Sequence, residues 1–151
     1  SMMLADIESQ VREMMEQRDC RLIYPDDLGN IVTNPAKYKL IFTNLITNAI
    51  KYYDSNKTEA WVKVSRVSEA DNENIAIEIS DNGLGISQEM VEKVFKLRAR
   101  AHEDSHDVDG HGLGLFLARQ AARDLGGSIS LNSKPMKGSE FTVSVARSLE
   151  Q

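Results

Sequence analysis

Two pairs of short segments alternate between apolar and polar residues, and this alternation constrains the fold more than any other feature of the sequence. A polar turn at 68–74 separates the first pair, and a turn at 133–138 separates the second. The alternating apolar residues are Val62, Val64, Val67, Ile75, Ile77, Ile79, Ile129, Leu131, Phe141, Val143 and Val145. A period of two places every second side chain on one face of a strand. The sequence therefore predicts two antiparallel hairpins, each with an apolar face that another layer must cover.

Segments with helical spacing supply that layer. Apolar residues recur every three or four positions over 4–18, 35–53, 87–95 and 112–125, which is the spacing of one helix face. Asn34 and Pro35 are typical of a helix start, and Gly126 and Gly127 of a helix end. We expect short strands at 22–23 and 31–32. The order of elements predicts an α+β fold in which helices cover one mixed, mostly antiparallel sheet, a two-layer α/β sandwich.

Size and composition agree with one domain over residues 4–148. The chain has 151 residues, 41% of them hydrophobic, and we set residues 1–3 aside as a tag remnant. A net charge of −5 argues against nucleic acid as a partner. The longest apolar run, 113–118, is too short for a membrane span, and we expect no membrane contact by this domain. The single Cys20 cannot form an internal disulfide, which favours a cytoplasmic location, whether or not the parent protein is membrane-anchored.

Within the helix predicted over 35–53, Asn44, Asn48 and Lys51 fall on one edge, beside an apolar stripe. Asparagine lowers helix propensity, so two of them four residues apart need a reason. One explanation is a solvated face. The other is a ligand site, because a carboxamide oxygen is a neutral ligand for Mg²⁺ and the Lys51 ammonium complements phosphate charge. The residues alone leave both explanations open.

Two glycine-containing segments lie at the ends of predicted elements. Residues 81–85, Asp-Asn-Gly-Leu-Gly, follow a strand. They form either a turn in which Asp81 caps the next helix, or a site where its carboxylate accepts from an exocyclic amine while glycines let the backbone approach a flat ring. Residues 110–114, Gly-His-Gly-Leu-Gly, precede a helix and form either a hinge or a phosphate site. The polar residues 98–110 before them predict a mobile loop that acts as a lid.

In this order the motifs resemble the ATP-binding catalytic domain of sensor histidine kinases, in the superfamily that includes gyrase-, Hsp90- and MutL-type ATPases. Residues 44–52 are similar to the N box of that family, 81–85 to its first glycine box and 110–114 to its second. The resemblance implies the Bergerat fold, with ATP and Mg²⁺ as cofactors. The nucleotide-binding residues that it implies are Asn44, Asn48, Lys51, Tyr52, Asp81, Gly83, Gly85, Ile86, Gly110, His111, Gly112, Leu113, Gly114 and Ser139.

The implied roles divide between the two ends of the nucleotide. By the resemblance, Asn48 coordinates Mg²⁺, while Asn44, Lys51 and the second glycine box line the phosphate site. The residues implied at the other end are Asp81, which holds the adenine amino group, Gly83 and Gly85, which shape the pocket, Ser139, near the base, and Tyr52, against the nucleotide.

Two positions depart from the family pattern. Phe95 matches the first phenylalanine of the F box, but Arg98 stands where the second is expected. Arg100 aligns with the arginine that follows, so it is the first candidate for a γ-phosphate contact and Arg98 the second. Met136 stands where the family usually has a glycine, which leaves the geometry of the last turn open.

The residue at position 44 bears on the reaction. Hydrolysing members of the superfamily carry a glutamate there, which activates water, whereas the amide of Asn44 cannot act as a base at neutral pH. A neutral histidine nitrogen is already a nucleophile, so positioning and charge neutralisation suffice for phosphoryl transfer to histidine. We therefore expect a histidine protein kinase, with Asn44, Lys51 and Arg100 as its catalytic residues.

The phosphorylated histidine is expected outside this chain. His102, His106 and His111 lie in or beside the polar loop, and this segment supplies no rigid scaffold for a zinc site. The expected partner is a dimerisation and phosphoacceptor domain of the parent kinase, with a response regulator as an indirect partner. We expect the isolated chain to be monomeric.

Three alternatives stay open. The first is a serine/threonine kinase of the same superfamily, which Asn44 disfavours because those kinases use glutamate there. The second is a nucleotide-binding module without catalysis, and the third is an interaction module that binds no nucleotide.

Overall fold

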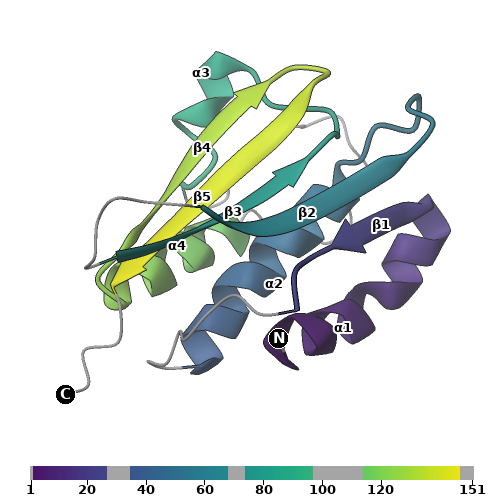
Figure 1. Cartoon of the computed structure of the whole chain (residues 1–151). Helices are drawn as coiled ribbons and strands as arrows, with labels where there is room; N and C mark the ends of the chain where they lie inside the picture. The colour runs from purple at the N-terminus through teal and green to yellow at the C-terminus, as the bar shows by residue number, and fades with distance from the viewer. Residues whose placement is uncertain (1, 27–34, 68–73, 97–113, 147–151) are drawn as a thin grey trace.

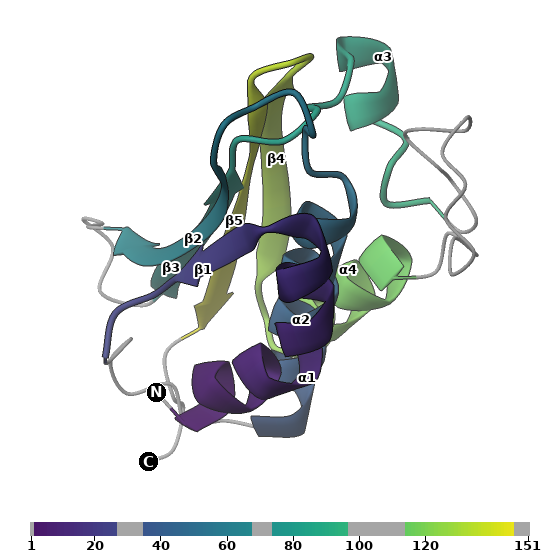
Figure 2. The same ribbon diagram turned by 90° about the vertical axis from the view of Figure 1, so that its right-hand side faces the viewer.

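The computed structural model describes residues 2–26, 35–67, 74–96 and 114–146. These residues form a five-stranded sheet with helices over one face (Figures 1 and 2). The helices are α1 (Met2–Arg18), α2 (Pro35–Lys51), α3 (Gln88–Val91) and α4 (Gly114–Asp124). The strands are β1 (Cys20–Ile23), β2 (Ala60–Val67), β3 (Asn74–Asp81), β4 (Ser128–Lys134) and β5 (Gly138–Ala146).

The sheet is mixed and mostly antiparallel, as the sequence predicts. Its strand order is β1-β2-β3-β5-β4, and only the pairing of β1 with β2 is parallel. The two predicted hairpins are β2–β3 and β4–β5, and they meet where β3 pairs with β5. The ends of β3 and β5 near Asp81 and Ser139 therefore lie side by side in the middle of the sheet.

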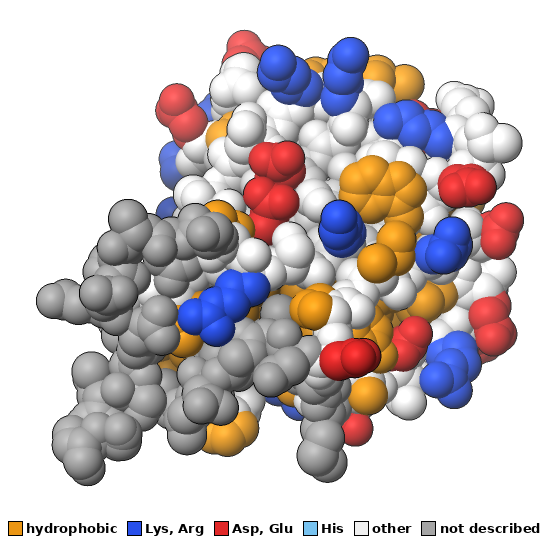
Figure 3. All heavy atoms as spheres, viewed as in Figure 1, with side chains coloured by type: hydrophobic (Ala, Val, Ile, Leu, Met, Phe, Trp, Pro, Cys, Tyr) orange, Lys and Arg blue, Asp and Glu red, His pale blue; other side chains and the backbone are white. Residues whose placement is uncertain are grey.

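The apolar alternation forms the core between the two layers. Val64, Ile79 and Phe141 are register partners across β2, β3 and β5, and all are buried. The stripe of α2 predicted to face the sheet is buried as well: Tyr38, Phe42, Leu45 and Ala49. Burying a large apolar side chain contributes about 1.5–3 kcal/mol, so this stripe fixes which edge of α2 is left for polar residues. The opposite face of the sheet carries interspersed side chains of both charge signs (Figure 3).

Several helix boundaries differ from those expected, and the strand expected at 22–23 begins at Cys20. Helix α1 begins at Met2, inside the segment set aside as a tag remnant, and Met3 packs against the core. Helix α2 ends at Lys51 rather than at 53. Helix α3 ends at Val91 rather than at 95, because the N–H groups of Lys93 and Lys96 donate to carbonyls three residues back, as in a series of turns.

Several expectations lie outside the described residues: the strand at 31–32, the turn at 68–73, the loop at 98–110 and the helix start at 112–113. Across the described segments, the helices lack the combination of length and apolar character that a membrane span requires.

Position 136, where the sequence departs from the family pattern, lies in the turn between β4 and β5. Met136 has a φ of +66°, in the left-handed region that disfavours residues with a Cβ atom. Its side chain is 56% exposed, so packing of this side chain offsets little of the conformational penalty. A methionine thus adopts here a left-handed conformation that glycine adopts without this penalty.

Replacing this residue tests that reading. Met136→Gly should raise the free energy of unfolding by roughly 0.5–1 kcal/mol, because relief of the left-handed penalty exceeds the extra backbone entropy of glycine in the unfolded chain. Urea denaturation measures the difference. Met136→Ala is the control: it removes the same side chain but keeps the Cβ atom, so it should give no gain. Equal stabilisation by both variants would contradict the backbone explanation.

Candidate functional site

The polar edge of α2 meets the start of α4 at Asn44. The Asn44 amide nitrogen donates to the Leu40 carbonyl at 2.9 Å, a bond that fixes the orientation of the carboxamide. A Cβ atom on Gly114 would lie 2.9 Å from Oδ1 of Asn44, so a side chain there would require the carboxamide to shift. The N box and the last residue of the second glycine box are therefore in contact. Asn48 and Lys51 lie one and two turns farther along the same helix, and both are partly exposed.

The C-terminal end of α2 packs against the first glycine box. The Leu84 N–H donates to the Tyr52 carbonyl at 3.0 Å. A Cβ atom on Gly83 would approach the same carbonyl oxygen to 2.5 Å, so glycine is required for this contact. The structure thus brings Tyr52 and Gly83 together through their backbones.

Asp81 is the last residue of β3, and backbone groups orient its carboxylate. Oδ1 accepts from the Gly83 N–H at 2.8 Å, and the Ser139 backbone N–H also donates to the carboxyl group. Burial raises the pKa of Asp81 from 3.8 to about 6, and the two backbone hydrogen bonds and the charge of Lys57 oppose this rise. The group is therefore mostly ionised at pH 7. Because a carboxylate has about four acceptor positions, it retains capacity for a ligand donor.

The alternative role for Asp81, capping the next helix, is not observed. The N-cap of α3 is Ser87, whose side chain accepts from the Met90 N–H. This removes helix capping as the explanation for the carboxylate, while its bond to the Gly83 N–H still shapes the turn.

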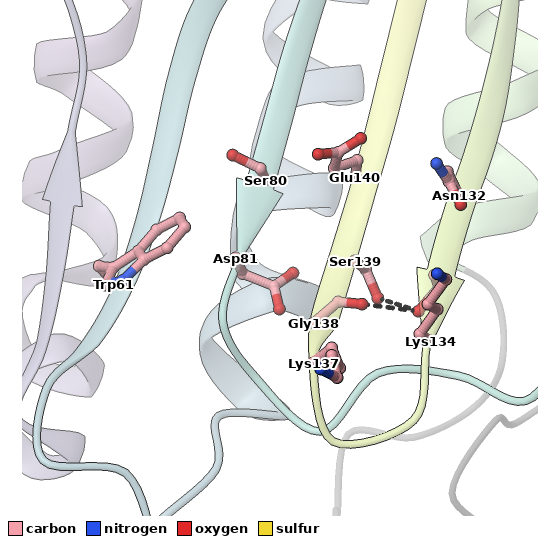
Figure 4. A pocket seen from close by; sticks show the side chains of 10 residues that line it. Trp61, Ser80, Asp81, Asn132, Lys134, Lys137, Gly138, Ser139 and Glu140 are labelled. Carbon is pink, nitrogen blue, oxygen red and sulfur yellow. Dashed lines mark hydrogen bonds between the residues drawn. The ribbon is translucent and has the colours of Figure 1, made fainter.

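Ser139, the cross-strand partner of Asp81, lies in a buried cluster of hydrogen bonds. Its Oγ is 2.7 Å from Oγ of Ser133, which accepts from the Ile86 N–H at 2.8 Å and contacts the Gly138 carbonyl at 3.0 Å. Figure 4 shows Asp81, Gly138 and Ser139 at adjoining ends of β3 and β5. The cluster joins the first glycine box to the last hairpin.

Gly85 reinforces the same junction. It has a φ of +75°, and a Cβ atom there would lie 1.9 Å from the Lys134 carbonyl oxygen. The Met136 N–H also donates to the Leu84 carbonyl. Gly85 thus allows the hairpin turn to pack directly on the loop that follows Asp81.

A hollow of about 310 Å³ opens beside this junction (Figure 4). Asp81, Ser133 and Ser139 contribute to its lining. Its other lining residues include Trp61, Ser80 and Glu140, which alternate with buried residues and belong to the uncovered face of the sheet. Asp81 and Ser139 fall in the opposite alternation, in step with the buried Ile79 and Phe141. The hollow therefore opens on the side away from α2.

The other sequence-predicted site residues lie outside the described residues: Arg98, Arg100, Gly110, His111, Gly112 and Leu113. Two residues that support the site, Asn82 and Lys57, were not predicted from the sequence. The Asn82 side chain accepts from the Trp61 N–H at 3.0 Å and donates to the Glu59 carbonyl at 2.7 Å, which fastens the start of β2 to the loop. Lys57 lowers the pKa of Asp81. Neither has a local sequence signal, because both act across long separations.

Comparison with known proteins settles the family. Residues 33–148 match the model of the family described as histidine kinase-, DNA gyrase B-, and HSP90-like ATPase. The chain belongs to this ATPase family. Among relatives, the sensor histidine kinase GacS of Pseudomonas protegens is 34% identical over 125 residues, which cover 82% of this chain. The chain spans only 14% of the length of GacS.

Solved structures agree on the fold. Full-length ShkA in complex with AMPPNP has a TM-score of 0.76 and 16% identity, covering 99% of this chain and 30% of that one. The catalytic domain of the histidine kinase ThkA has a TM-score of 0.73 and 19% identity, covering 96% of this chain and 92% of that one. The two-layer arrangement is thus the Bergerat fold of this ATPase family.

The raised pKa of Asp81 predicts a pH-dependent stability. Between pH 3.8 and about 6 the folded chain holds a proton at Asp81 that the unfolded chain releases, so the free energy of unfolding falls as the pH rises through this window. Relative to Asp81→Asn, the parent should lose about 1 kcal/mol between pH 5 and pH 7.5. Urea denaturation of both proteins at both pH values measures this, since other titrating groups cancel. A difference that does not change with pH would contradict the assigned pKa.

Proposed function

We propose that residues 4–148 form the ATP-binding catalytic domain of a sensor histidine kinase, which binds Mg-ATP and transfers its γ-phosphoryl group to a histidine on another domain. Membership in the ATPase family supports nucleotide binding, and the AMPPNP in the ShkA complex supports ATP as the nucleotide. The similarity to GacS supports a sensor kinase as the parent protein.

In this proposal the purine end of ATP binds beside Asp81. The ionised carboxylate accepts from the exocyclic amine of adenine, and the absence of a Cβ atom at Gly83 keeps the loop flat against Tyr52. Ser139 lies next to Asp81 in the sheet. Gly85 and Ile86 hold the loop on the last hairpin, through the Lys134 contact and the bond to Ser133.

The phosphate end lies where α2 meets α4. Asn44 and Gly114 are already in contact, and the N–H groups at the N-terminus of α4 favour negative charge. Lys51 supplies a cation on the same helix edge. The remaining residues proposed here, from the family resemblance alone, are Gly110, His111, Gly112, Leu113 and, at the γ-phosphate, Arg100.

Asn48 fits a Mg²⁺ ion. Among the residues that the structure describes, no group of three or more His, Cys, Asp or Glu side chains could hold a metal. Mg²⁺ does not need such a group, because it keeps several waters and binds phosphate oxygens together with one or two protein oxygens. When bound, the ion neutralises phosphate charge, and Asn48 contributes a neutral oxygen that adds no repulsion.

Asn44 is the single observation that carries the choice of reaction. It lies beside the start of α4. By the family resemblance, hydrolysing members carry a water-activating glutamate at this position, whereas the amide of Asn44 cannot accept a proton at neutral pH. Hydrolysis is therefore disfavoured. In transfer to histidine, the bond from the γ-phosphorus to the bridging oxygen breaks, a bond to the imidazole nitrogen forms, ADP leaves and the histidine releases a proton.

The surrounding system follows from this reaction. The acceptor histidine belongs to a dimerisation and phosphoacceptor domain, and a response regulator receives the phosphoryl group from it. We place the domain in the cytoplasm as a monomer when isolated. Asn44 also disfavours the serine/threonine kinase alternative, because a serine hydroxyl requires a base.

Phosphotransfer provides the test. Mixing the chain with Mg-ATP and the dimerisation and phosphoacceptor domain of its parent should produce a phosphoprotein that is labile in acid and stable in base, as a phosphorus–nitrogen bond is. A base-labile, acid-stable product would indicate serine or threonine phosphorylation. ATP hydrolysis without an acceptor product would equally contradict the proposal.

Matched variants localise the activity. Asn48→Asp should lower phosphotransfer at least about tenfold, because the added carboxylate charge repels the phosphates at the metal site. Asn56→Asp makes the same change in an exposed turn and should leave transfer unchanged. Equal activity of the two variants would remove Asn48 from the metal site.

A further inference from the structure

Ser133 lies where three segments of the chain meet, and its hydroxyl has three polar neighbours. They are the Ile86 N–H at 2.8 Å, the Ser139 hydroxyl at 2.7 Å and the Gly138 carbonyl at 3.0 Å. Ser133 is 3% exposed and Ser139 7% exposed. Water therefore does not compete for these bonds, and the donors and acceptors of the cluster must be paired within it.

Counting protons fixes the direction of each bond. A serine hydroxyl has one proton and two acceptor positions. The Ile86 N–H occupies one acceptor position of Ser133, and the Gly138 carbonyl, which can only accept, requires the proton of Ser133. The 2.7 Å contact is then made by Ser139 donating to the second acceptor position of Ser133.

The reverse direction is less favourable. If Ser133 donated to Ser139, no proton would lie between Ser133 and the Gly138 carbonyl, and two buried oxygens would stand 3.0 Å apart without a bond. A buried acceptor that loses its partner is destabilised by about 1–3 kcal/mol. The arrangement with three satisfied contacts is therefore preferred.

The consequence reaches the base site through Ser139. With its proton directed at Ser133, the Ser139 hydroxyl offers only acceptor positions to a ligand. Asp81 is its cross-strand partner, so both side chains lie on the same face of the sheet. The ionised carboxylate also only accepts. The ends of β3 and β5 thus carry two neighbouring side-chain acceptors, Asp81 and Ser139, on this face.

We propose that Ser133 is a positioning residue which holds the proton of Ser139 away from the ligand and so makes the site select 6-amino purines over 6-oxo purines. An amino group donates to these acceptors, whereas a carbonyl oxygen at the same position has no proton to donate. This inference rests on the proposed nucleotide site and adds the residue that sets its base preference.

Binding of two nucleotides tests the proposal. ITP differs from ATP in its purine, with a carbonyl in place of the amino group and a proton on N1. Calorimetric titration gives both dissociation constants for the parent chain, which should bind ATP more tightly. Ser133→Ala frees the Ser139 proton to donate to a carbonyl. The ratio of the ITP constant to the ATP constant should then fall at least about fivefold, since a mismatched buried hydrogen bond is worth about a factor of ten.

Two further variants keep the test decisive. Ser133→Cys retains the side-chain volume but is a weak donor and acceptor, so it should lower the ratio even if the alanine variant does not fold. Ser130→Ala removes an exposed hydroxyl from the same strand and should leave the ratio unchanged.

The outcomes separate the two proposals. Equal weakening of ATP and ITP by the Ser133 variants would make Ser133 a purely structural residue and overturn the inference. Equal affinity of the parent chain for both nucleotides would overturn it as well, while leaving nucleotide binding intact. If the parent chain binds neither nucleotide, the proposed function itself fails.

Discussion

The candidate site depends on how one carboxylate is held at the end of a strand. Asp81 accepts from the backbone N–H groups of Gly83 and Ser139, one from its own loop and one from the neighbouring strand. Burial makes the charge unfavourable, and these two bonds and Lys57 offset part of that penalty. A carboxylate oriented by backbone groups cannot rotate freely, so its remaining acceptor positions point in a defined direction. That direction is what a purine amino group would recognise.

Close packing of backbone around Asp81 makes this orientation possible. Gly138 has a φ of +108°, and a Cβ atom there would lie 2.0 Å from the Asp81 carbonyl oxygen. Gly83 and Gly85 make similar approaches to Tyr52 and Lys134. Each glycine joins the loop after β3 to a different part of the chain. These glycines therefore allow the close backbone packing around Asp81. A side chain at any of these positions would displace the carboxylate.

The elements that follow local patterns could be predicted from the sequence. Alternation identified β2, β3, β4 and β5, and the apolar stripe of α2 placed Asn44 and Asn48 on its polar edge. Features that depend on distant contacts could not be predicted. Ser133 bonds to Ile86 across 47 positions, and Asn82 bonds to Glu59 across 23. The parallel pairing of β1 and the start of α1 at Met2 likewise depend on packing against the rest of the domain.

The most direct measurement of the central claim is the amide NMR spectrum of the chain titrated with Mg-AMPPNP. The Asp81-centred site predicts saturable shifts of the Gly83, Ile86 and Ser139 amides, with little change at Lys63 and Ser130 on the uncovered face. Shifts confined to Trp61, Asn132 and Glu140 would instead place the nucleotide in the hollow on the uncovered face. That result, or no shift at Gly83 and Ser139 under saturation, would contradict the claim that this carboxylate holds the base.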